Sequence, residues 1–284
     1  MSTSRLLIEC PDARGVVARV AACIASAGGN ILDADQHTDP DTHRFFMRVE
    51  FEPEAGLTER SFLDAFGPTA DELSIAYRLR WADAPARRVA ILCSRSTHCL
   101  SDLLWRFANG DFPGGEVAVV LSNHEAGRSL AEHAGVGFLH EPIVGGDKAA
   151  QEQRLIGHIE DSGAEVVVLA RYMQVLSAGF IERFNSRAIN IHHSFLPAFA
   201  GAKPYHQAFE RGVKLIGATS HYVTEELDDG PIIAQRTARV SHRDTVSDLV
   251  RKGRDLERVV LADAVRLHLS DRVLVPGRKT VVFD

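Results

Sequence analysis

The chain has 284 residues, of which 45% are hydrophobic and 25% charged, the ordinary balance of a globular protein. Its formal net charge of −6 at pH 7 argues against a nucleic-acid partner, and no apolar run approaches the roughly 20 residues that a membrane span needs. The four cysteines (Cys10, Cys23, Cys93 and Cys99) show no CxxC spacing, so we expect reduced thiols in a cytoplasmic protein.

The charge is distributed unevenly along the chain. Residues 1–84 contain 14 acidic and 8 basic residues, whereas residues 85–284 contain 24 of each. The length also exceeds the roughly 100–200 residues of a usual single domain. We therefore expect two domains, 1–84 and 85–284.

The first segment alternates apolar runs with turn residues. Strands are predicted at 5–10, 30–36, 44–51 and 72–80, with one helix from Val16 to the Gly28-Gly29 pair and another at 58–66. The resulting βαββαβ order predicts a ferredoxin-like antiparallel sheet with both helices on one face.

The second segment alternates strands and helices. Continuous apolar runs predict buried strands at 88–93, 116–121, 166–170, 188–192 and 214–223. Helices are predicted at 98–107, 125–134, 149–161 and 244–269, followed by a closing hairpin over 272–283. This α/β pattern predicts a doubly wound, mostly parallel, Rossmann-like sheet that binds ligands beyond the carboxyl ends of its strands.

One strand ends in residues that can carry chemistry. Asn190 and His192 are two positions apart, so on a strand they share a face. An amide can stabilise an oxyanion, an imidazole can move a proton near neutral pH, and a carboxylate can orient the imidazole. The later turn that offers a carboxylate contains Glu225, Glu226, Asp228 and Asp229. The set suits attack on an acyl carbonyl. Alternatively, Asn-x-His is a turn element and the acidic turn containing Asp228 is solvated surface.

The other reactive side chains give weaker signals. The 13 histidines match no HExxH or Cys/His zinc spacing, so we expect no metal and no cofactor. Cys93 and Cys99 flank the first turn of the second segment, where buried structural thiols are the simpler interpretation.

Three motifs resemble a known family. NIHHSFLP, GAKPYHQAFERG and HYVTEELDDGPII resemble, in order and spacing, the formyltransferase-fold proteins that use 10-formyltetrahydrofolate. This resemblance implies that Asn190, His192 and Asp228 are the catalytic residues. The opening CPDARGVVARVAACIASAGGNI resembles an ACT domain, and an ACT domain followed by this fold resembles the formyltetrahydrofolate deformylases.

The resemblance implies an activity. Deformylases hydrolyse 10-formyltetrahydrofolate to tetrahydrofolate and formate, which supplies formate for purine synthesis and balances the one-carbon folate pool. The transferases of the family hold a substrate phosphate on a glycine-rich turn, and the turn at 93–100 has no glycine, which fits water as the acceptor. Two alternatives remain: formyl transfer to an amine such as glycinamide ribonucleotide, and a non-catalytic folate-binding protein that senses amino acids.

The resemblance also places the folate. Its pterin ring would lie against the segment that follows the strand at 166–170, where the implied binding residues are Arg171, Tyr172, Met173, Val175 and Leu176. Val175 and Leu176 could instead simply fill the core.

In the first segment, the ACT resemblance implies a small-molecule site and an oligomer. Asp12 and Arg14 could bind the two ends of a free amino acid, Gly15 would let the backbone approach it, and Asn30 opens the next strand. Asp12 could alternatively cap the helix. A small two-layer module leaves a sheet face or edge to cover, so we expect a homodimer or homotetramer.

Overall fold

The computed structural model describes residues 3–198 and 204–284, so the first three residues of the GAKPYHQAFERG motif lie outside the described residues. The chain forms two compact units, the first comprising 1–85, 271–276 and 281–284 and the second 86–270 and 277–280. None of the described helices combines the length and apolar character needed to cross a bilayer.

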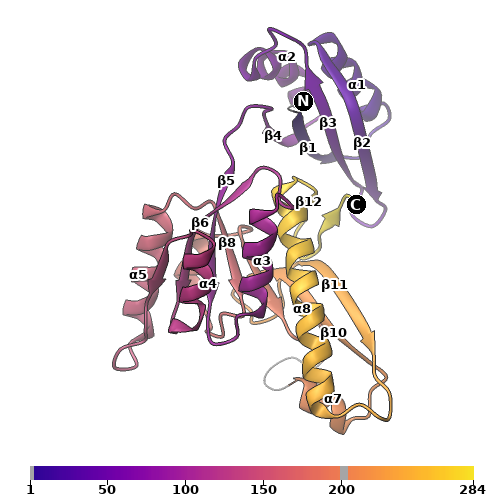
Figure 1. Cartoon of the computed structure of the whole chain (residues 1–284). Coiled ribbons are helices and arrows are strands. Elements are labelled where there is room, and N and C mark those ends of the chain that lie inside the picture. Colours follow the sequence, from indigo (N-terminus) through magenta and orange to yellow (C-terminus); the bar gives the residue numbers. More distant parts are fainter. Residues whose placement is uncertain (1–2, 199–203) are drawn as a thin grey trace. The chain divides into compact units, whose positions relative to one another are not determined.

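The first unit is a four-stranded antiparallel sheet covered on one face by two helices (Figure 1). The strand order is β2-β3-β1-β4, which confirms the predicted ferredoxin-like fold. Its elements are β1 (Ser4–Pro11), α1 (Val16–Ser26), β2 (Gly29–Asp39), β3 (Arg44–Pro53), α2 (Glu59–Glu72) and β4 (Ala76–Arg80).

The end of this unit differs from the prediction. Helix α2 continues through Pro68 to Glu72, and β4 begins at Ala76. The capping box between Thr58 and Ser61 fixes the start of the helix, and its buried side includes Ala70, beyond the proline. Packing of that last turn therefore outweighs the helix-breaking tendency of Gly67-Pro68.

The predicted closing hairpin is present as β12 (Val273–Leu274) and β13 (Val281–Val282), paired antiparallel. Its Leu274 and Phe283 pack with Leu7 and Phe46, whose side chains lie on the face of the first sheet opposite the helices. The C-terminal residues therefore belong to the first unit, whereas we expected them in the 85–284 domain. Sequence order placed them there, and only tertiary packing shows otherwise.

The second unit is a seven-stranded sheet in the order β11-β10-β9-β8-β5-β6-β7. Strands β5 to β9 pair in parallel, and β10 pairs antiparallel with both β9 and β11. Its strands are β5 (Arg87–Cys93), β6 (Gly115–Ser122), β7 (Phe138–His140), β8 (Val166–Ala170), β9 (Ala188–His192), β10 (Leu215–Tyr222) and β11 (Ile232–Arg239). Its helices are α3 (His98–Ala108), η1 (Glu125–Gly127), α4 (Arg128–His133), α5 (Lys148–Asp161), α6 (Ala178–Arg183), α7 (Pro204–Glu210) and α8 (Val246–Leu269).

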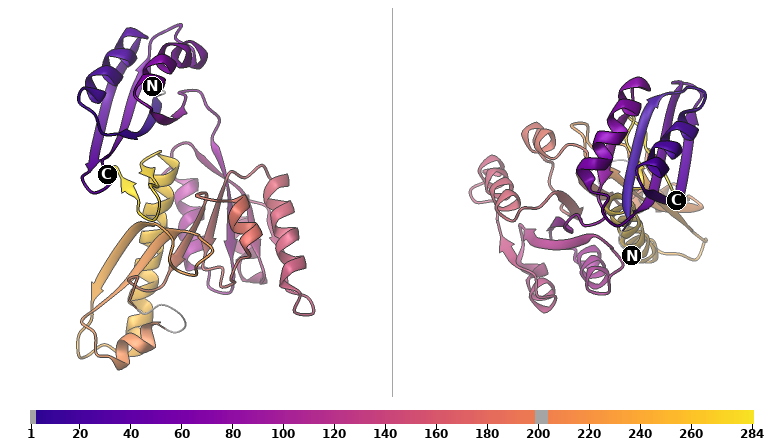
Figure 2. Two further views of the ribbon diagram at one scale, coloured as in Figure 1. Left: turned by 180° about the vertical axis from the view of Figure 1, so that it is seen from behind. Right: turned by 90° about the horizontal axis from the view of Figure 1, so that it is seen from above.

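Helices cover both faces of this sheet, as the mostly parallel, doubly wound prediction requires. Helices α5 and α6 pack with alternate residues of the central strands, and α3, α4 and α8 lie on the opposite face (Figures 1 and 2). Strands β7 and β11 were not predicted, because β7 has only three residues and β11 is a polar edge strand without a continuous apolar run.

The placement of the C-terminal hairpin can be tested by stability. Phe283 is 3% exposed in its cluster with Leu7, Phe46 and Leu274. Phe283→Ala should lower the free energy of unfolding by about 3–5 kcal/mol, the usual cost of a deleted buried aromatic ring. Urea denaturation measures this, with Phe209→Ala as the control because Phe209 is 45% exposed. A loss below about 1 kcal/mol would contradict the packing described.

Candidate active site

Strand β9 presents two polar side chains from an otherwise apolar strand. Ile189 and Ile191 are buried in the second unit, whereas Asn190 and His192 alternate with them and share the other face. His192 is 5% exposed and is the last residue of the strand. The two functional groups thus lie at the carboxyl end of a buried strand, where this fold class binds ligands.

The turn after β10 returns a carboxylate to this strand. Asp228 Oδ1 lies 3.1 Å from His192 Nδ1, so the imidazole donates to the carboxylate from Nδ1. The backbone of this turn passes close to β10 at Gly230, where an added Cβ would lie 1.7 Å from the carbonyl oxygen of Tyr222. Only glycine fits there, and the turn is also held by the Tyr222 N–H, which donates to the carbonyl of Pro231 at 2.9 Å.

The electrostatics of the pair follow from this contact. Burial alone would raise the pKa of Asp228, but the hydrogen bond from His192 outweighs it, so the pKa of Asp228 is lowered. Asp228 is therefore a carboxylate at neutral pH. The other ring nitrogen, His192 Nε2, is buried and has no hydrogen-bond partner among the described residues, so it is available to a ligand.

A second histidine, His221, orients Asn190. The register of β9 and β10 places His221 opposite Asn190, and its Nε2 lies 3.3 Å from Asn190 Nδ2. Burial lowers the pKa of His221, so its ring is neutral, and its Nδ1–H donates to the Tyr222 carbonyl at 2.8 Å. Nε2 then accepts from Asn190, which fixes the amide and leaves its second N–H free to point elsewhere. The sequence analysis assigned no role to His221, because its partner Asn190 is 31 residues away. The signal that could have found it is the antiparallel pairing of β9 with β10.

All three predicted catalytic residues line one cavity of about 510 Å³. The predicted folate-binding residues line the same cavity: Arg171, Tyr172, Met173, Val175 and Leu176. Met173 and Val175 are 56% and 66% exposed, so they form its rim and do not fill the core. Leu176 is partly buried against the core, as the alternative interpretation had it. Burial raises the pKa of Tyr172 to about 12, so its phenol stays protonated.

The predicted effector residues Asp12, Arg14, Gly15 and Asn30 are all exposed in the first unit. Gly15 precedes α1 with a φ of 86°, a conformation that suits glycine. Helix α1 has no side-chain cap, so Asp12 does not cap it. The capping alternative is therefore wrong, and the role of these four residues stays a prediction.

The cysteines are all free. Burial raises the pKa of Cys93 to about 11 and that of Cys99 well above its usual value. Both are therefore thiols at neutral pH and poor nucleophiles, in agreement with the predicted structural role.

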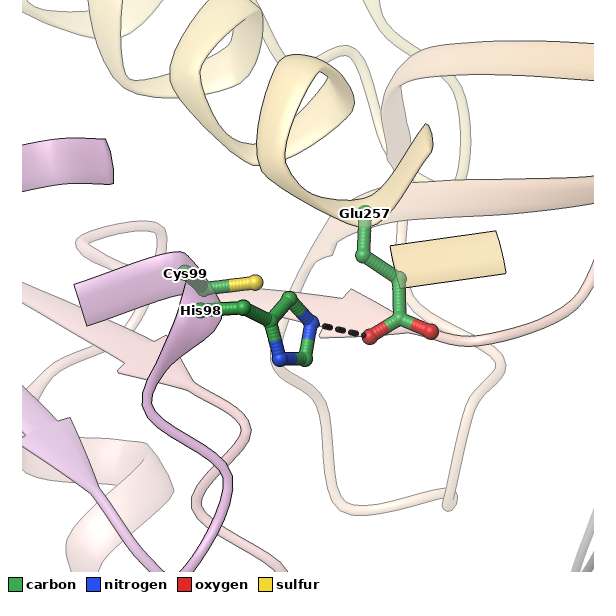
Figure 3. Close-up of side chains that lie close together, drawn as sticks. All are labelled: His98, Cys99 and Glu257. Carbon is green, nitrogen blue, oxygen red and sulfur yellow. Dashed lines mark hydrogen bonds and ion pairs between the residues drawn. The ribbon is translucent and has the colours of Figure 1, made fainter. Parts of the chain in front are cut away.

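One cluster among the described residues has donor types that can bind a metal: His98, Cys99 and Glu257, whose candidate ligand atoms lie within 4.8 Å of one another (Figure 3). The carboxylate of Glu257 already accepts from His98 Nε2 at 2.8 Å and from the Tyr205 hydroxyl at 2.7 Å. The Arg171 guanidinium adds a positive charge 3.3 Å away. The cluster is therefore a hydrogen-bonded ion-pair network, and its charge disfavours a cation.

Comparison with known proteins decides the family. The formyl transferase family model matches residues 87–265, and the ACT domain model matches residues 4–62. A formyltetrahydrofolate deformylase of Synechocystis sp. (strain ATCC 27184 / PCC 6803 / Kazusa) is 48% identical over 99% of this chain and 98% of its own. The chain belongs to the formyltetrahydrofolate deformylase family. The resemblance drawn from the motifs is thereby confirmed.

Solved structures agree with the family. The crystal structure of a formyltetrahydrofolate deformylase from Pseudomonas syringae pv. tomato str. DC3000 is 48% identical, with a TM-score of 0.96 over 100% of this chain and 95% of that one. A glycinamide ribonucleotide transformylase from Symbiobacterium toebii is 36% identical, with a TM-score of 0.67 over 70% of this chain and 95% of that one. The deformylase thus resembles this chain over both units, and the transformylase covers only part of it.

His193 gives a test of the site's electrostatics. Its side chain is 9% exposed, and burial together with the charge of Arg171 lowers its pKa from 6.5 to about 4. Between pH 6.5 and about pH 4, the unfolded chain therefore binds more protons at His193 than the folded protein does. The free energy of unfolding is consequently not reduced by His193 above pH 6.5, and it decreases as the pH falls toward 4.

We expect the wild-type protein to lose about 2 kcal/mol more stability than His193→Gln between pH 7 and pH 5. Urea denaturation at the two pH values measures the difference. His206→Gln is the matched control, because His206 is exposed. Equal pH dependence in the wild type and His193→Gln would show that His193 is not held neutral by burial.

Proposed function

We propose that this chain hydrolyses 10-formyltetrahydrofolate to tetrahydrofolate and formate, and that Asn190, His192 and Asp228 perform the reaction. The observation that carries the proposal is the His192–Asp228 contact of 3.1 Å at the wall of a cavity that Asn190 also lines. The pterin would lie against Tyr172, Met173, Val175 and Leu176, and the formyl group would face the polar wall.

The reaction needs one water molecule. The water oxygen adds to the formyl carbon while its proton passes to the His192–Asp228 pair, and the resulting oxyanion receives hydrogen bonds from Asn190 and His192. The bond between the formyl carbon and N10 then breaks, and a proton passes from the pair to N10. The products are tetrahydrofolate and formic acid, which loses its proton to solvent to give formate, and the chain returns to its starting state without a covalent intermediate.

The fixed orientation of Asn190 supports its part in this scheme. An oxyanion donor is effective when its position is set before the reaction, because no reorganisation is then needed. Asn190 is held by His221, which is itself held by the backbone of Tyr222. The free N–H of the amide can therefore meet the developing charge.

Replacing Asn190 tests the oxyanion role. Asn190→Ala should lower the turnover number by about 10²–10³, the usual cost of one oxyanion donor, with little change in folate affinity. Formate release and tetrahydrofolate binding measure the two quantities. Asn185→Ala, on the loop before β9, is the control. Turnover above half of the wild-type value in Asn190→Ala would remove Asn190 from the mechanism.

Replacing Asp228 tests whether the protein is a catalyst or only a binder. Asp228→Asn keeps the shape of the side chain but removes the charge that pairs with His192, and should lower turnover by about 10²–10⁴. Titration with tetrahydrofolate should show retained binding. Unchanged formate release would contradict proton transfer by this pair, and no formate release from the wild type would contradict hydrolysis itself.

The finer features belong to the same proposal. Free thiols at all four cysteines favour a reducing compartment such as the cytoplasm, and the mechanism requires no cofactor. The first unit would bind a free amino acid through Asp12 and Arg14, beside Gly15 and Asn30, and would join subunits into a homodimer or homotetramer. The exposure of these four residues and the position of β2 at an edge of its sheet support this role.

The proposed effector site is tested by measuring how formate release responds to free amino acids. Formate release should change on addition of free amino acids, and Arg14→Ala should abolish that change because the guanidinium can no longer bind the carboxylate. Arg60→Ala is the control, because Arg60 is an exposed residue of α2 in the same unit. A wild-type rate that is unaffected by each of the twenty amino acids would contradict the proposed effector role.

A further inference from the structure

The relatives raise a question about the acceptor. A transformylase that is 36% identical shares the fold of the second unit, and its name states glycinamide ribonucleotide as its substrate. Hydrolysis and amine transfer differ in the group that attacks the formyl carbon. In a deformylase, the active site must therefore allow water to reach the formyl carbon and prevent amines from reaching it.

The strand order locates the place where a second substrate would enter. From β5 the chain moves to β6 on one side, and later to β8 on the other side of β5. Sheets of this class bind ligands in the crevice beyond the carboxyl ends of the strands at which the order reverses, which here are β5 and β8. Two residues follow the carboxyl ends of these strands: His98 is the first residue of α3, after β5, and Arg171 comes directly after β8.

Side chains of the protein already occupy this crevice. Glu257 of α8 is 1% exposed and accepts hydrogen bonds from His98 on one oxygen and from Tyr205 on the other (Figure 3 shows His98 and Glu257). Tyr205 lies so close to α8 that a Cβ at Gly253 would be 2.1 Å from its hydroxyl oxygen. The carboxylate therefore has a hydrogen-bond donor on each oxygen.

Arg171 completes the network and also reaches the catalytic cavity. Its Nε lies 3.3 Å from Glu257, and the residue lines the cavity together with Asn190 and His192. Its backbone φ is 64°, a conformation that glycine adopts readily and arginine rarely does. The fold thus holds an arginine where a glycine would cost less, and the positive charge of Arg171 also helps lower the pKa of His193.

The charge of the network suits exclusion of amines. An acceptor amine is largely an ammonium ion near neutral pH, and a buried carboxylate would attract it. Here hydrogen bonds from His98 and Tyr205 and the charge of Arg171 hold the pKa of Glu257 below its usual range despite burial, so it is ionised but already compensated. The Arg171 guanidinium meets an incoming ammonium with a like charge, whereas neutral water is not repelled.

We propose that Arg171, held by Glu257, is the residue that makes water the acceptor, by filling the crevice beside the catalytic cavity and excluding amines from it. This inference rests on the proposed deformylase activity. In the excluded reaction the amine nitrogen would bond to the formyl carbon, the bond to N10 would break, one proton would pass to N10, and an N-formyl amine would replace formate.

The test is the partition of the formyl group between water and an amine. Full-length wild type and Arg171→Gly are incubated with 10-formyltetrahydrofolate carrying a ¹³C formyl group and with glycinamide, and NMR measures N-formylglycinamide against formate. Arg171→Gly should raise this ratio at least about tenfold, the usual discrimination by one pocket group. Arg171→Lys keeps the charge and should stay closer to the wild-type ratio. A general loss of activity would not move the ratio.

Ser186→Gly is the matched control, because Ser186 also has a positive φ, 56°, but lies outside the cavity and the network. It should keep the wild-type ratio. If Arg171→Gly does not fold, Arg171→Asn replaces it, since asparagine tolerates this backbone conformation. An unchanged ratio in a folded variant, or failure of both variants to fold, would overturn the inference. Absence of formate release by the wild type would instead overturn the proposed function.

Discussion

The site depends on the antiparallel pairing of β10 with β9. The strand pairs from β5 to β9 are all parallel. If β10 were also parallel to β9, its carboxyl end would lie beside that of β9, and no tight turn would lead from β10 back to His192. Because β10 runs in the opposite direction, its residues lie opposite those of β9, and the turn after it reaches back to His192. One change of strand direction thus brings His221 to Asn190 and Asp228 to His192.

Close packing of backbone fixes this arrangement. Gly230 allows the turn to pass the carbonyl of Tyr222 with no room for a side chain, and the same region holds the ring of His221 through its backbone hydrogen bond. The loop after His192 is held in a similar way: Thr219 accepts from the N–H of Leu196 at 3.0 Å and donates to the carbonyl of Ser194 at 2.9 Å. The reacting groups therefore rest on a rigid strand and two restrained loops, as preorganised catalysis requires.

The sequence predicted the parts of the site that have a local signal. The two-residue spacing of Asn190 and His192 placed both on one face of a strand, and the resemblance of HYVTEELDDGPII to a known motif singled out Asp228. Glu257 and His221 were missed because burial and distant partners determine their roles: Glu257 meets His98 across 159 positions of the chain. The same limit explains why strand β11 and the packing of Phe283 on the first sheet were not predicted, since neither has a local pattern that differs from a surface segment.

The central claim is that water attacks the formyl carbon at the Asn190–His192–Asp228 wall. The most direct measurement follows the oxygen: the full-length protein is incubated with 10-formyltetrahydrofolate in ¹⁸O-labelled water without any amine, and the formate is analysed by mass spectrometry. The account predicts one labelled oxygen atom in each formate molecule, formed at a rate far above that of Asp228→Asn. Formate that carries no label, or a formate yield equal to that of a protein-free solution, would contradict it.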